Sequence, residues 1–123
     1  MVTQDVPDYA QQVAPSVPST TQSQLSKVLT ASAANATEIV AAVASKSIVV
    51  VSYVLVANAA VNVKFQSDGT PTDLTGLLYL AANGGVVAGF NQQGWFRTIA
   101  GEALDIHLSA AVAVGGHLNY VLV

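Results

Sequence analysis

The chain has 123 residues, of which 52% are hydrophobic and only 9% are charged, and its formal net charge is −3. This length fits one domain, with or without a tail, and the absence of any basic run excludes nucleic acid and anionic lipid as expected partners, because both need clustered Lys or Arg. Since soluble proteins carry about 25% charged residues, one copy cannot cover itself with charge in the usual way, and we expect a partner to cover part of its surface.

Residues 1–35 are predicted to form an extended or partly disordered arm, because they are rich in Pro, Ser, Thr and Gln and poor in large apolar side chains. The N-terminus lacks the positive and apolar regions of a secretory signal, and residues 24–34 are expected to form at most a short helical turn. The prolines favour extended backbone that could seat in grooves of another protein; a disordered end is the alternative. The candidate binding residues of the arm are Val6, Pro7, Tyr9, Val13, Pro15, Val17 and Pro18.

Residues 36–123 are predicted to form an all-β domain. Runs of β-branched and aromatic residues are separated by Gly, Asn and Ser, which is typical of short strands and turns. Eight strands are expected, at residues 39–43, 48–56, 61–66, 77–81, 85–90, 95–99, 104–109 and 118–123, with a further extended piece at 111–114. This spacing predicts an antiparallel jelly-roll β-sandwich, and the lack of crossover helices excludes a parallel α/β sheet.

The uncharged stretch at residues 47–63 is not expected to cross a membrane. Its length of about 17 residues is at the bottom of the spanning range. It contains Asn58 and Asn62, and its many Val and Ile residues favour a strand.

Two predicted strands, 48–56 and 118–123, are apolar on both faces. Alternation divides the side chains of strand 48–56 between two faces: Val50, Val54 and Val56, and Val49, Val51, Tyr53 and Leu55. Only one face of a sandwich strand meets the intramolecular core, so we expect another copy to cover the second face; burial under loops of a closed barrel is the alternative. The predicted trimer-interface residues are Val50, Tyr53, Val54, Val56, Tyr120 and Leu122.

The titratable side chains do not form a recognisable catalytic set, so we expect no enzyme activity and no cofactor. Asp105, His107 and Ser109 share one strand face, but three side chains in a line along a strand cannot adopt the geometry of a catalytic triad. With no cysteine and two histidines, a zinc site would need symmetry to bring copies of one histidine together, and the turn at 67–73 lacks the ligands of a calcium loop. Arg97 and Glu102 are placed to pair across a hairpin turn.

Several motifs resemble those of small capsid decoration, or cement, proteins of tailed bacteriophages. They are residues 80–85 (LAANGG), 90–91 (FN), 94–96 (GWF), 100–104 (AGEAL), 108–112 (LSAAV) and 116–120 (GHLNY). The resemblance covers about residues 37–123 and leaves the arm outside. Related modules also occur at the ends of viral fibres.

The resemblance implies a jelly-roll homotrimer, similar to the tumour-necrosis-factor fold, on the outer surface of a phage head where capsid hexamers meet. Such a trimer would stabilise contacts between major capsid protein subunits. The composition of the arm suggests that it anchors the trimer to the shell. The alternative functions are a receptor- or glycan-binding jelly-roll module of a tail or head fibre, and a small hydrolase.

Overall fold

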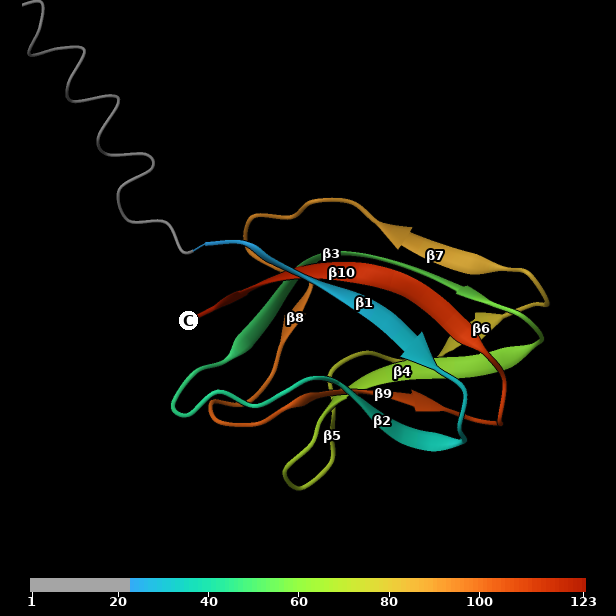
Figure 1. Ribbon diagram of the computed structural model, residues 1–123, viewed down its shortest axis with the longest axis horizontal. Helices are drawn as coiled ribbons and strands as arrows, with labels where there is room; N and C mark the ends of the chain where they lie inside the picture. The colour runs from blue at the N-terminus through green and yellow to red at the C-terminus, as the bar shows by residue number, and fades with distance from the viewer. Residues whose placement is uncertain (1–22) are drawn as a thin grey trace, which may run out of the picture.

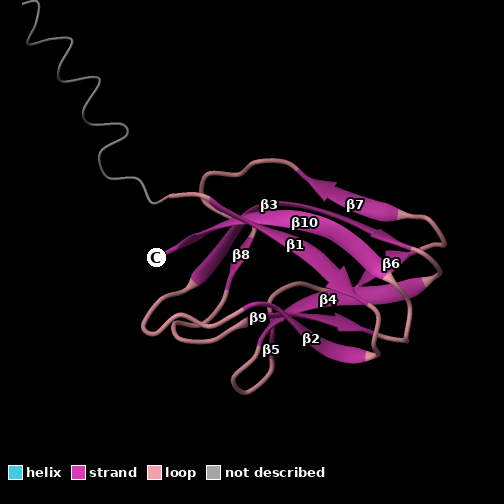
Figure 2. Cartoon of the chain, in the orientation of Figure 1, coloured by secondary structure: helices cyan, strands magenta, loops and turns pink. Residues whose placement is uncertain are grey.

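The computed structural model describes residues 23–123, and every regular element in that range is a strand (Figure 2). The strands are β1 (Leu25–Ala31), β2 (Asn35–Val40), β3 (Ile48–Ala57), β4 (Val61–Ser67), β5 (Thr72–Asp73), β6 (Leu78–Leu80), β7 (Gly85–Ala88), β8 (Phe96–Arg97), β9 (Leu104–Leu108) and β10 (Val114–Leu122). The all-β prediction is therefore confirmed. Residues 23–123 contain no helix of the length and apolar character needed to cross a bilayer.

The strands form two five-stranded antiparallel sheets that lie one over the other (Figure 1). Sheet I has the order β1-β10-β3-β7, with β8 also paired to β3. Sheet II has the order β2-β9-β4-β5, with β6 also paired to β4. The chain crosses between the sheets from β1 to β2, β2 to β3, β3 to β4, β6 to β7, β8 to β9 and β9 to β10. This strand order is that of a jelly roll, as the sequence predicted.

The core lies between the two sheets and is built from the alternate, inward-facing side chains of the long strands. An aromatic group sits within it: the Phe65 ring stacks on Phe96 with centroids 4.9 Å apart and meets the edge of Tyr53 at 5.3 Å. The large, fully buried side chains are Leu29, Ile48, Leu55, Phe65, Leu104, Ile106, Leu108 and Leu118. Burial of this apolar surface is the main force that holds the two sheets together.

The turn that follows β4 is stabilised by hydrogen bonds to Glu102 and is not simply solvated. The Glu102 carboxylate accepts hydrogen bonds from the Ser67 hydroxyl (2.6 Å) and the Gly69 N–H (3.0 Å). Beside it, the Asp68 carboxylate accepts a hydrogen bond from the Ala103 N–H (3.0 Å). Glu102 therefore binds this turn instead of Arg97, which corrects the pair expected from the sequence, and Asp68 is used to join two loops.

The segment Leu25–Ala31 is an edge strand of sheet I, which corrects the helical turn expected there. All seven residues pair with β10, and Leu29 and Ala31 are buried in the core. Its Val and Thr residues favour a strand, and pairing with β10 supplies the tertiary context on which strand formation depends. The sandwich thus begins upstream of the boundary expected between residues 35 and 36. The predicted arm-binding residues Val6, Pro7, Tyr9, Val13, Pro15, Val17 and Pro18 lie outside the described residues.

A β-bulge in β3 changes which side chains face the core. Val50 pairs with Tyr120 and Ser52 pairs with Asn119, so Val51 is an extra residue with no opposite partner in β10. The bulge shifts the alternation by one residue and places Val50 on the same, inward face as Tyr53. The predicted division of side chains between the two faces of this strand is therefore correct for the residues after Val51 and is reversed for the residues before it.

Gly116 lets β10 approach β3 closely, and we expect Gly116→Ala to lower stability. Its φ is +156°, and a Cβ at this position would overlap the Val54 carbonyl oxygen, which belongs to the backbone and cannot move aside cheaply. We expect a loss of about 1–3 kcal/mol in the free energy of unfolding, the usual cost of overpacking, measured by denaturant titration. Gly76→Ala is the matched control, since open space surrounds Gly76; equal effects of the two substitutions would contradict this explanation.

Candidate assembly interface

The outer face of sheet I carries a row of apolar side chains that crosses four strands. Val28 on β1 is opposite His117 on β10, His117 is opposite Val54 on β3, and Val54 is opposite Val87 on β7. Val28 and Val87, at the two ends of the row, are 70% and 77% exposed. Directly opposed side chains on one face are neighbours, so the row is a strip of three valines that is interrupted by the imidazole of His117.

The rows on either side of this strip differ in character. On one side, Val56 is 47% exposed and pairs with Gly85 and Gly115, and the row ends on β1 at Thr30, so its side chains are small and include one hydroxyl. Gly85 lies so close to the Leu55 carbonyl oxygen that a Cβ would overlap it. We call the surface formed by Val28, Val54, Val56, Val87 and His117 the valine face.

On the other side of the strip, three polar side chains form a ladder. The Ser26 hydroxyl donates to the Asn119 side-chain oxygen (2.6 Å), and the Asn119 amide donates to the Ser52 hydroxyl (3.1 Å). These polar groups satisfy one another, so they do not need water on every side. The ladder marks one border of the valine face.

Part of the second apolar face of β3 is covered by the chain itself. Val49 and Val51 are buried, at 3% and 2% exposure. The Asn91 N–H donates to the Val51 carbonyl (2.8 Å), and Gly94 lies against the Val49 side chain, where a Cβ would not fit. The loop between β7 and β8 therefore covers this end of β3, and only the Val54–Val56 end is left to face outward.

The structure separates the six predicted interface residues into three groups. Val50 and Tyr53 belong to the monomer's own core, because the bulge at Val51 turns them inward. Tyr120 and Leu122 are half-buried and pack against the core. Val54 and Val56 lie on the valine face. The sequence prediction did not include Val28, Val87 and His117, because only the pairing of the four strands aligns them with Val54.

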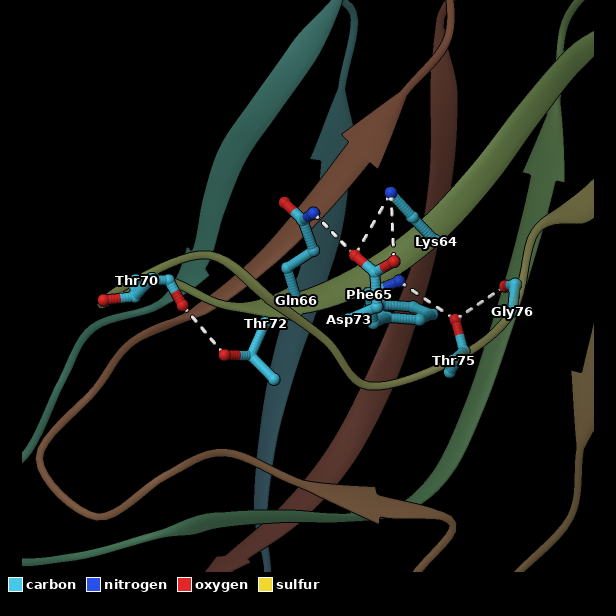
Figure 3. Close-up of polar contacts among 8 residues, drawn as sticks. All are labelled: Lys64, Phe65, Gln66, Thr70, Thr72, Asp73, Thr75 and Gly76. Carbon is cyan, nitrogen blue, oxygen red and sulfur yellow. Dashed lines mark hydrogen bonds and ion pairs between the residues drawn. The ribbon is translucent and has the colours of Figure 1, made fainter.

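The outer face of sheet II is charged, in contrast to the valine face. The Asp73 carboxylate accepts hydrogen bonds from the Gln66 amide (2.9 Å) and the Lys64 ammonium (3.2 Å), as Figure 3 shows. The Gln66 hydrogen bond, followed by that of Lys64, lowers the pKa of Asp73 below its ordinary value. Glu38, Asp105 and Gln66 continue this polar row across the sheet.

The residues considered for catalysis do not come together in the described range. Ser109 Oγ accepts a hydrogen bond from the Asn62 N–H (3.0 Å), and within residues 23–123 no hydrogen bond joins Asp105, His107 and Ser109 to one another. In the same range, no group of three or more His, Asp and Glu side chains is placed to hold a metal ion. The arrangement on this strand is a polar outer face, and its side chains have separate partners.

The environment of Asp105 disfavours its charge. Its Oδ1 is buried and has no hydrogen-bond partner among the described residues. Burial raises the pKa of Asp105, and the negative charges of Asp68 and Glu38 raise it further. A carboxyl group whose pKa is higher in the folded than in the unfolded protein stabilises the fold below its unfolded pKa, and this contribution is lost as the pH rises through the folded pKa.

We therefore expect Asp105→Asn to raise the urea midpoint at about pH 7 and to change it little at about pH 3, where the carboxyl group is protonated. Asp73→Asn is the matched control with the opposite sign. The lowered pKa of Asp73 means that its charge stabilises the fold above the unfolded pKa, and that this stability is lost as the pH falls through the folded pKa. A lower midpoint for Asp105→Asn at about pH 7 would contradict this assignment.

Together these features define a jelly-roll β-sandwich domain with one charged outer face and one apolar outer face. No family model matches the sequence, and no curated protein matches it. One solved structure is similar, under the description "Bacillus endospore appendages form a novel family of disulfide-linked pili". The similarity has a TM-score of 0.49 and 21% sequence identity, and it covers 83% of this chain and 85% of that chain. The present sequence has no cysteine.

Proposed function

We propose that this protein is a structural, non-enzymatic virion protein: a decoration, or cement, protein that sits as a homotrimer on the outer surface of a tailed-phage head. In this role it binds the major capsid protein and needs no cofactor. The observation that carries the assembly part of the proposal is the valine face. The phage head as the location comes from the resemblance of residues 37–123 to cement proteins.

The valine face favours other copies of the same chain as its cover. Four of its five side chains are valines, and its end residues are 70% and 77% exposed in one copy. Contiguous exposed apolar surface of this kind typically marks an interface, and its burial is favourable in proportion to the area removed from water. A trimer closes when a threefold rotation relates its copies, so that different parts of the valine face on neighbouring copies meet around the axis. The charged outer face of sheet II remains solvated.

The arm supplies the link to the shell. The part of the predicted arm that precedes the edge strand β1 is residues 1–24, so in a trimer three such segments leave the same assembly. Ordering an extended segment costs roughly 1–2 kcal/mol per residue, but three arms on one body bind multivalently, and loss of one contact does not release the trimer. A trimer held in this way would clamp neighbouring capsid subunits without performing any chemistry.

A variant of the full-length chain tests the arm. With Val6, Tyr9, Val13 and Val17 all changed to Ser, we expect the protein to keep the mass of the unmodified assembly but to bind decoration-free phage heads at least about tenfold more weakly. Co-sedimentation with heads measures the binding, and Tyr79→Ser, on the outer face of sheet II, provides a control outside both the arm and the valine face. Undiminished binding by the arm variant would remove the arm from the mechanism.

A further inference from the structure

The loop between β7 and β8 is built to hold one conformation. β7 and β8 both pair with β3, and this loop is longer than a direct connection between them would be. It lies opposite the bulge at Val51 (the orange segment between β7 and β8 in Figure 1). The backbone N–H of Trp95 donates to the Val50 carbonyl (2.8 Å), which fixes the end of the loop to β3. Inside the loop, the Gly94 N–H donates to the Asn91 carbonyl (2.9 Å), and the Gln93 N–H donates to Asn91 Oδ1 (3.0 Å).

This ordered loop presents two large aromatic side chains to solvent. Phe90 is 64% exposed and Trp95 is 50% exposed. The Trp95 indole N–H donates to the Gly89 carbonyl (2.8 Å), so the ring is held beside the residue that precedes Phe90. An exposed Trp normally keeps several rotamers; here its ring is fixed before any ligand arrives, which lowers the entropy cost of binding.

Amide side chains lie between these aromatic residues in the sequence. Gln92 and Gln93 are exposed, no charged residue occurs from residue 74 to residue 96, and the exposed Arg97 follows on β8. Amides donate and accept hydrogen bonds, and aromatic faces pack against flat C–H surfaces. A neutral pyranose ring combines these two requirements, because it has an apolar C–H face with hydroxyl groups around its rim.

The geometry points to a binding site for a neutral oligosaccharide on the loop Gly89–Trp95, with Trp95 and Phe90 as the stacking surface and Gln92 and Gln93 as the hydroxyl ligands. This site is separate from the proposed assembly role, because the loop covers the Val49 end of β3 while the valine face lies at the Val54 end. A decoration protein with this site would attach the particle to neutral glycans on a surface.

The chain contains a single tryptophan, so its fluorescence reports on this loop alone. We would titrate the full-length protein with hexamers of glucose (α-1,4 and β-1,4 linked), of N-acetylglucosamine and of mannose, to millimolar concentration. We expect a saturable change in Trp95 emission with at least one of them. Phe90→Ala and the double variant Gln92→Ala/Gln93→Ala keep the reporter, and each should weaken binding by about tenfold.

Tyr79→Ala is the control, since Tyr79 is an exposed aromatic residue on sheet II, and it should leave binding unchanged. No saturable change with any of the four hexamers would overturn the proposal. Binding that is the same in the Phe90 and Gln92/Gln93 variants would place the sugar elsewhere and also overturn it. If Phe90→Ala instead changes the mass of the sugar-free assembly, the loop is part of a contact between copies and not a glycan site.

Discussion

Val28→Lys combined with Val87→Lys is expected to split the proposed trimer into single copies. Both side chains are highly exposed in one copy, at opposite ends of the valine face, so the substitutions should leave the fold of that copy intact. In the assembly, the new ammonium groups would lose water and face like charges, which costs several kcal/mol. We expect association to weaken by at least about a hundredfold, measured by sedimentation velocity over a concentration series.

Tyr79→Lys is the matched control for this experiment. Tyr79 is as exposed as the two valines, at 75%, but it lies on sheet II. The control should keep the mass of the unmodified protein. If Tyr79→Lys dissociates the assembly and the valine variant does not, the copies meet through sheet II and the valine face is not the interface.

Phe65→Ala is expected to have the largest effect on the stability of the sandwich itself. Phe65 is fully buried at the centre of sheet II and stacks on Phe96 across the core. Truncation removes this contact and the one with Tyr53, and it leaves a cavity between the sheets. The expected loss is about 3–5 kcal/mol in the free energy of unfolding, measured by denaturant titration at one fixed protein concentration because assembly adds to apparent stability.

Tyr79→Ala removes a similar aromatic side chain from the surface of the same sheet and should change the free energy of unfolding by less than about 0.5 kcal/mol. Equal losses in Phe65→Ala and Tyr79→Ala would mean that the space between the sheets is not the core. The comparison therefore tests the layer arrangement and not only the importance of one residue.

Most of the fold was predictable because alternation along a strand is a local signal. Leu104, Ile106 and Leu108 alternate with polar residues, and the structure buries all three. In the same way, Val61, Val63 and Phe65 face the core. Strands of this length and spacing have few arrangements available other than a sandwich or barrel, which explains why the jelly roll could be expected.

The features that could not be predicted depend on pairing between distant segments. β1 is a short segment of mixed polar and apolar residues that becomes a strand because β10, more than eighty residues later, pairs with it. The bulge at Val51 occurs in a run of valines in which no residue differs from its neighbours, so its position is set by the partner strand and by the loop that closes over it. One extra residue reverses the facing of every side chain beyond it, and this moved Val50 from the predicted interface into the core.

The candidate interface was accessible to sequence reasoning only in part. Excess apolar surface on β3 correctly indicated that Val54 and Val56 face away from the core. The companions Val28, His117 and Val87 come from three other strands, and only the strand order brings them into one row. Because strand order is a property of the whole chain, composition could indicate an apolar surface but could not locate it.

The most direct test of the account is the mass of the unmodified, full-length protein in solution. Sedimentation velocity at micromolar concentration should show one species with three times the 12.6 kDa mass of a single chain. The valine face would then be covered by other copies, as proposed. A stable, single-copy species at the same concentration would contradict the account, because it would show that one chain tolerates this apolar face in water.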